Sequence, residues 1–98
     1  MSADAVLNVG FDNAVMAARV VAVVDADPLP VKRLRAAAER HGKLIDATNG
    51  RRTRTVIVTD SDHVVLSSLQ PETVVQRLHG LRESGGDGPE TESARRPR

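Results

Sequence analysis

Residues 53–69 of the chain, TRTVIVTDSDHVVLSSL, contain two runs of β-branched and apolar residues separated by a polar centre. Alternating and β-branched runs of this length are typical of strands. The centre, Asp60-Ser61-Asp62, is typical of a tight turn, because these short side chains hydrogen-bond to the neighbouring backbone. The stretch therefore predicts a β-hairpin with strands over 53–59 and 63–69.

Before this hairpin, the sequence predicts two strands and a helix. The first strand covers Val6 to Val9, ends at Gly10 and is followed by a polar loop around Asp12 and Asn13. The second covers Arg19–Val24 (RVVAVV) and stops at a segment containing Pro28 and Pro30. Pro30 suits the first turn of a helix, where its missing N–H is not needed, and that helix is expected to end at Gly42.

Between this helix and the hairpin, Leu44 and Ile45 predict a short strand, and Asn49-Gly50 suits a turn with positive φ at both residues. After the hairpin, Gln70-Pro71-Glu72-Thr73 opens a second helix, with an acidic residue at the positive end of its dipole. The expected order is β-β-α-β-β-β-α, a small α/β (α+β) fold. Residues 3–82 form one folded domain, and the Gly-, Ser-, Pro- and charge-rich residues 83–98 are expected to be a disordered tail.

Composition excludes several classes of protein. The 98 residues include no cysteine, so disulfides and zinc–thiolate sites are impossible. No apolar stretch approaches the ~20 residues that a membrane-spanning helix needs, and no secretory signal is evident. Phe11 is the one aromatic residue, which removes the stacking platforms of common single-strand and RNA binders. We expect a cytoplasmic protein associated with the nucleoid.

Positive charge gathers in one part of the chain. The net charge is only +1, but residues 31–54 hold eight basic and two acidic residues, a local charge of +6. On a helical wheel, one arc of the first predicted helix is apolar and is expected to pack; it comprises Val31, Leu34, Ala37, Ala38 and His41. The opposite arc is a basic stripe made of Lys32, Arg33, Arg35, Arg40 and Lys43. Such a stripe can be a solvated face or can contact a polyanion.

The strongest candidate for a binding site is Gly50-Arg51-Arg52-Thr53-Arg54, directly after the predicted turn. A glycine lets the backbone approach a ligand closely, and each guanidinium can bind phosphate oxygens with two parallel hydrogen bonds. Two readings of this arginine cluster remain open: it binds phosphate, or it pairs internally with Asp46, Asp60 or Asp62.

Enzymatic and metal-binding functions find little support. Asp60, Asp62 and His63 are clustered, but they lack the further ligands of a calcium loop and the spacing of a zinc site. No Gly-rich phosphate loop follows a strand and opens a helix, and no serine has a recognisable base partner. We expect a protein that is not an enzyme, needs no cofactor or metal, and has no small-molecule substrate.

Several motifs together resemble one bacterial family, that of the extracellular matrix regulatory protein RemA. They are residues 46–54 (DATNGRRTR), 56–66 (VIVTDSDHVVL) and 70–74 (QPETV), together with VGFDNAV near the N-terminus, ARVVAVV and Pro30-Val31-Lys32-Arg33. The similarity covers about residues 6–82. One departure lies at Asp12, where the family usually has glycine, and another at Asp25-Ala26, which replaces a typical Ser-Pro.

The resemblance implies a small cytoplasmic protein, related in fold to LytTR-type DNA-binding domains, that forms closed homo-oligomeric rings and binds double-stranded DNA on their outer surface. Its expected role is to activate transcription of biofilm and extracellular matrix genes. By matched position, Arg51 and Arg52 would contact DNA and Arg54 would assist them. Arg19 and Pro30 would be positions on which fold or function depends, and Arg19, Lys32 and Arg33 complete the predicted DNA-binding set. The alternative is an oligomeric scaffold that recognises an acidic protein.

Overall fold

The computed structural model describes the backbone of residues 5–85 and the side chains of residues 5–81. Its elements follow one another as a strand hairpin, a 3-10 turn, a strand, a helix, three strands and a final helix. They are β1 (Val6–Gly10), β2 (Asn13–Met16), η1 (Ala17–Arg19), β3 (Val20–Asp25), α1 (Leu29–Arg40), β4 (Leu44–Asp46), β5 (Thr55–Thr59), β6 (Val64–Ser67) and α2 (Pro71–Gly85). The structure confirms the predicted α+β class.

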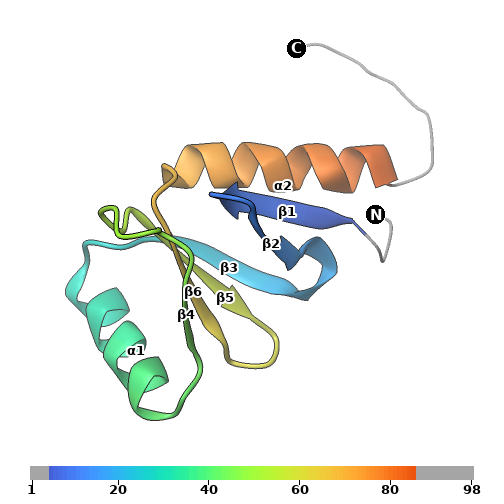
Figure 1. Ribbon diagram of the computed structural model, residues 1–98. Coiled ribbons are helices and arrows are strands. Elements are labelled where there is room, and N and C mark those ends of the chain that lie inside the picture. The colour runs from blue at the N-terminus through green and yellow to red at the C-terminus, as the bar shows by residue number, and fades with distance from the viewer. Residues whose placement is uncertain (1–4, 86–98) are drawn as a thin grey trace.

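A four-stranded sheet in the order β3-β5-β6-β4 forms the middle of the molecule, and β1 and β2 form a separate two-stranded sheet. Strands β5 and β6 pair antiparallel, with Ile57 opposite Val65, which confirms the predicted hairpin. The short strand β4 pairs with β6 in parallel. Figure 1 shows α2 and β1 on one side of the four-stranded sheet and α1 on the other.

Alternation along the central strands supplies two apolar cores, one on each face of the sheet. Ile57 and Val65 point toward α2, where they pack with Leu7, Val74 and other buried residues. Their neighbours along the same strands point the other way and pack with Ala38 of α1; they are Val56, Val64 and Leu66. Because side chains alternate between the faces of a strand and both faces are covered, the two central strands can bear apolar side chains on both faces.

One predicted element was wrong. The polar loop expected around Asp12 and Asn13 is in fact a tight hairpin turn, and Asn13–Met16 forms strand β2, paired antiparallel with β1. Phe11 and Asp12 both have positive φ, 53° and 63°, so the turn takes the backbone form that glycine usually provides. Without a glycine at either position, the sequence lacked the usual signal for such a turn.

The remaining bounds lie close to the predicted ones. Asn49 and Gly50 have φ of 54° and 81°, which confirms the predicted turn with two positive values. Helix α1 begins one residue before Pro30 and ends at Arg40, two residues before Gly42. Helix α2 extends to Gly85 and so includes the first three residues of the predicted tail. The rest of that tail, residues 86–98, lies outside the described residues.

Candidate functional site

The arginine loop, residues 50–54, follows a turn that is fixed by one carboxylate. Asp46, at the end of β4, accepts hydrogen bonds from the hydroxyl and the backbone N–H of Thr48, at 2.6 and 2.9 Å. These bonds lower the pKa of Asp46 below its ordinary value of 3.8, and the positive charge of Arg35 acts in the same direction. Thr48 is buried, and its carbonyl accepts from the backbone N–H of Arg51 at 3.0 Å. The start of the loop is therefore anchored from within the fold.

The end of the loop is fixed by the sheet. The backbone N–H of Arg54 donates to the carbonyl of Ser67 at 2.9 Å. The carbonyl of Arg54 accepts from the backbone N–H of Ala26 at 3.1 Å. The next residue, Thr55, is fully buried, and its hydroxyl donates to the carbonyl of Leu69 at 2.6 Å. The backbone of Arg54 is thus hydrogen-bonded on both sides, while its side chain remains exposed.

Three separate segments of the chain bring the arginines to one cleft of about 400 Å³. The β1–β2 turn contributes Gly10 and Phe11, and the segment before α2 contributes Ser68 and Leu69. Arg51, Arg52 and Arg54 from the loop complete the lining. Three arginines and the apolar side chains of Phe11 and Leu69 therefore line the same hollow, and we call this site the arginine cleft.

Among the described side chains, few acidic groups compensate the charge of this cleft. Arg52 lies 3.7 Å from Asp27, with both side chains more than two-thirds exposed, so the pair is weak. Arg51 lies over the ring of Phe11, with its guanidinium carbon 5.3 Å from the ring centroid. Among the residues whose side chains are described, no ion pair joins the cleft to Asp46, Asp60 or Asp62, the acids considered from sequence. The guanidinium groups of these arginines can therefore bind an anion such as phosphate through two parallel hydrogen bonds each.

The other predicted binding residues lie in two different places. Lys32 and Arg33 are exposed in the first half of α1, the helix that begins just after the Asp27 segment beside the cleft. Arg19 lies at the opposite end of the sheet, because Val20 pairs with Thr59 whereas Asp25 pairs with Thr55. Its Nε donates to Asp60 at 2.7 Å. The structure brings Lys32 and Arg33 to the same end as the cleft but does not bring Arg19 there.

The cluster around Asp60 and His63 is a turn held by its own hydrogen bonds. The Ser61 hydroxyl lies 2.7 Å from His63 Nδ1 and 3.0 Å from the Thr59 hydroxyl, and Lys43 Nζ donates to the Ser61 carbonyl at 3.1 Å. In the part of the chain that the structure describes, no group of three or more His, Asp or Glu side chains is arranged to hold a metal ion.

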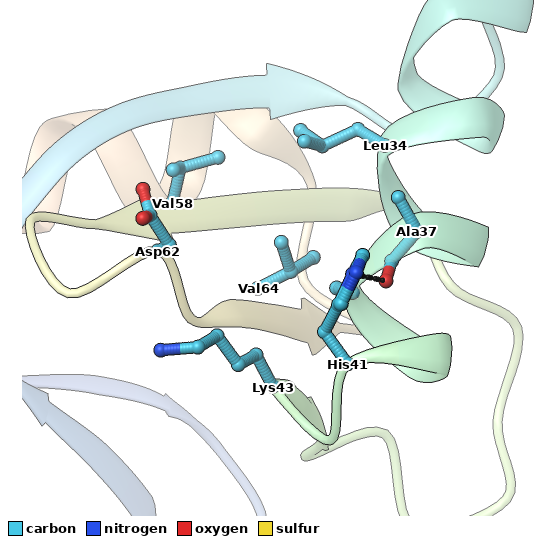
Figure 2. A pocket seen from close by; sticks show the side chains of 8 residues that line it. Leu34, Ala37, His41, Lys43, Val58, Asp62 and Val64 are labelled. Atoms are coloured by element: carbon cyan, nitrogen blue, oxygen red, sulfur yellow. Dashed lines mark hydrogen bonds between the residues drawn. The ribbon is translucent and has the colours of Figure 1, made fainter.

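A second hollow, of about 420 Å³, lies between α1 and the β5–β6 turn. Figure 2 shows its apolar side chains, with Lys43 and Asp62 at one end and His41 hydrogen-bonded to the carbonyl of Ala37. Leu34, expected to pack, remains 40% exposed here, and His41 is exposed as well. The apolar arc of α1 is thus only partly covered by the sheet. We call this hollow the α1 groove; its apolar walls make it unsuited to phosphate.

Sequence reasoning missed the residues that complete the cleft. In the sequence, Phe11 indicates only that aromatic stacking platforms are lacking, and Gly10, Ser68 and Leu69 carry no signal of a site. They reach the arginines because β1 and the end of β6 lie side by side, with the Ser67 hydroxyl donating to the Val9 carbonyl at 2.8 Å. Contacts between residues almost sixty positions apart cannot be deduced from local patterns.

In the described residues, no helix is long and apolar enough to span a membrane.

Comparisons with known proteins agree on one family. A family model described as extracellular matrix regulatory protein A-like matches residues 6–78. A Geobacillus thermodenitrificans protein is 54% identical over 82 residues, which cover 84% of this chain and 94% of that protein. A Shouchella clausii protein is 57% identical over 79 residues, covering 81% and 90%, and a Desulfotalea psychrophila protein is 57% identical over 76 residues, covering 78% and 68%. All three carry the words "Putative regulatory protein" in their names.

Proposed function

The chain belongs to the RemA-like family of regulatory proteins, and on that premise we propose that it is a DNA-binding transcriptional regulator. In this proposal Arg51, Arg52 and Arg54 bind the phosphate backbone of double-stranded DNA. Lys32 and Arg33 add positive charge at the same end of the molecule. The protein acts by binding and not as an enzyme, and its partners are DNA and further copies of itself.

The observation that carries the proposal is the arginine cleft. Three arginines within four residues line one hollow, and among the side chains that the structure describes, the acid that pairs with them is Asp27, which stands 3.7 Å from Arg52 and is largely exposed. Unneutralised arginines repel one another, and a phosphate group relieves this repulsion while accepting charge-assisted hydrogen bonds. Backbone hydrogen bonds hold both ends of the loop, so the arginines project from a fixed base.

Assembly into a ring is the second part of the proposal. One subunit offers three arginines at the cleft, which is few for stable binding to DNA at physiological salt. Repeating the cleft around a homo-oligomer multiplies the contacts along one duplex, and the effective concentration of each further site is high. The α1 groove, with Leu34 exposed at 40%, is an apolar surface of the kind that subunit interfaces cover.

Sequence preference is proposed to come from DNA shape. The cleft offers guanidiniums and one hydroxyl, that of Ser68, and in this proposal they contact phosphates, which carry no sequence information. Arginines enter narrow minor grooves readily, so we propose A·T-rich or repeated sites and a curved duplex. The family description points to genes of the extracellular matrix as targets, and activation of such biofilm genes is the proposed outcome.

The test is duplex-DNA binding as a function of salt, for the wild type and for the double variant Arg51→Ala, Arg52→Ala, with the oligomer mass measured for both. Each neutralised phosphate contributes about 0.9 to the log–log slope. We expect a steep slope for the wild type, and a reduced slope with unchanged mass for the variant. Wild type that fails to bind DNA at low salt would contradict the proposal. Binding of an acidic protein that excess duplex DNA does not displace would favour the scaffold alternative.

A further inference from the structure

The turn between β1 and β2 places the one aromatic residue of the chain at the arginine cleft. The ring centroid of Phe11 lies 5.3 Å from the guanidinium carbon of Arg51, although the two residues are forty positions apart in the sequence. This distance is within the range of a cation–π contact, in which the negative face of the ring attracts the cation. Phe11 is 43% exposed, so its ring is not needed to fill the core.

The backbone of this turn is strained, and it is also well anchored. Phe11 has a φ of 53°, in the left-handed region that bulky residues rarely occupy. The Asn13 side-chain amide donates to the carbonyls of Gly10 and Phe11, both at 3.2 Å. The Asn8 side chain accepts from the backbone N–H of Gly10 at 2.8 Å. These bonds hold Phe11 in a conformation that its own side chain does not favour.

The turn is also fixed against the rest of the molecule. Arg77 of α2 donates to the carbonyl of Asn8 at 3.2 Å. A Cβ atom added to Gly10 would lie 3.6 Å from the side chain of Leu69, and both residues line the cleft, so the turn lies next to the segment before α2. The ring of Phe11 is therefore presented to Arg51 from a rigid support.

We propose that Phe11 is a positioning residue for DNA binding: its ring holds the Arg51 guanidinium in place before phosphate arrives. This inference rests on the proposed function. Arginine is long and loses much rotamer freedom when it is fixed, so a preformed orientation reduces the entropy lost on binding. Positioning of Arg51 then explains why a strained turn presents an exposed ring at the cleft, although that ring does not fill the core.

The experiment compares Phe11→Leu with Phe11→Tyr in DNA affinity and in its salt dependence. Leucine keeps the apolar volume and loses the ring, whereas tyrosine keeps the ring. We expect Phe11→Leu to weaken binding about two- to fivefold per engaged subunit, with Phe11→Tyr close to the wild type. The salt slope should stay unchanged in Phe11→Leu, because no charge is lost, whereas Arg51→Ala should lower it by about 0.9 per engaged subunit.

Nuclear magnetic resonance of the DNA-free protein tests the contact itself. The side-chain protons of Arg51 should show a ring-current shift in the wild type and in Phe11→Tyr, and the shift should disappear in Phe11→Leu. Its absence from the wild type would overturn the inference, whether or not every variant folds. Equal DNA affinity of a folded Phe11→Leu and the wild type would overturn it too. If wild type does not bind DNA at all, the proposed function fails and the inference fails with it.

Discussion

Both ends of the central sheet carry arginines, but the two ends differ in how closely a carboxylate pairs with them. At the Thr55 end, the arginine cleft gathers three guanidiniums, and Asp27 approaches one of them to only 3.7 Å. At the Thr59 end, Arg19 binds Asp60 at 2.7 Å through its Nε, and the backbone N–H of Asp60 donates to the Arg19 carbonyl at 2.9 Å. A five-residue strand separates the ends, a distance of roughly 15 Å.

The difference shows that the position of an arginine does not by itself indicate its role. Arg19 has a carboxylate of its own chain, so its charge contributes to local structure. The cleft arginines have backbone groups fixed by the fold, and among the described side chains Asp27 alone forms an ion pair with them, an arrangement that suits the proposed anion site. If this comparison is right, substitutions of the same kind at the two ends should have different effects on DNA binding and on stability.

Charge reversal at the two ends should give the largest contrast. Arg54→Glu removes a proposed phosphate contact and adds repulsion, while the backbone bonds of residue 54 remain. We expect a loss of DNA affinity of about 10- to 100-fold, since hydrogen bonds to charged groups contribute about 1.5–3 kcal/mol. Arg19→Glu should change affinity less than about threefold. Fluorescence anisotropy at fixed salt measures both, and equal losses would show that total charge matters more than location.

Removal of the carboxylate that anchors the arginine loop should have the next largest effect. In Asp46→Ala, the buried Thr48 hydroxyl and the Thr48 backbone N–H both lose their acceptor. Leaving such groups unsatisfied lowers the free energy of unfolding by about 1–3 kcal/mol. Asp46→Asn keeps an acceptor oxygen and should lose less. Chemical denaturation tests this order, and an Asp46→Ala variant as stable as the wild type would contradict the anchoring role.

The sequence predicted the elements that carry a familiar local signal and missed the strand whose turn lacks one. Two β-branched runs around Asp60-Ser61-Asp62 were enough for the β5–β6 hairpin, and Asn49-Gly50 was enough for the turn before the arginine loop. Strand β2 was missed because Phe11 and Asp12 form a positive-φ turn without glycine. The turn is held by hydrogen bonds that the side chains of Asn8 and Asn13 make with the backbone of Gly10 and Phe11, and the sequence of the turn carries no familiar signal for them.

In the candidate site, residues close together in the sequence were predicted, and contacts between distant residues were missed. The cluster of Arg51, Arg52 and Arg54 was visible as a run of like charge, but the pairing of Arg19 with Asp60 was not. These two residues meet because β3 and β5 run antiparallel in a register that only the folded sheet sets. Phe11 joined the cleft through the same kind of long-range placement.

Acid should weaken the anchoring by Asp46 in a definite pH range. Hydrogen bonds from Thr48 lower the pKa of Asp46 in the folded state below its ordinary value of 3.8. A lowered pKa gives stability that is complete above the ordinary value and is lost as the pH falls through the folded value. The stability advantage of the wild type over Asp46→Asn should therefore shrink below pH 3.8. Denaturation at pH 6 and at pH 3 measures it, and an advantage that grows in acid would contradict this assignment.

Removing the acid beside the cleft should have a small effect of opposite sign. Asp27→Asn removes the carboxylate that lies 3.7 Å from Arg52 and so raises the positive charge available to DNA. Exposed pairs of this kind contribute about 0.2–1 kcal/mol, so we expect a two- to threefold rise in DNA affinity at low salt. Because salt screens exposed charges, the gain should fade as ionic strength rises. Unchanged affinity at low salt would show that Asp27 does not compete with phosphate.

Asp60→Asn, the matched substitution at the other end, should have the smallest effect of all. The pair with Arg19 is short but exposed, at 59% and 49% for the two side chains, so its loss lowers the free energy of unfolding by about 0.2–1 kcal/mol. The amide oxygen can still accept from Arg19 Nε, which keeps the loss near the lower value. Arg19 gains an unneutralised charge in this variant, yet it remains roughly 15 Å from the cleft. DNA affinity should therefore stay as in the wild type. A clear rise would mean that Arg19 also faces the duplex, and the DNA-binding surface would then extend along the whole sheet.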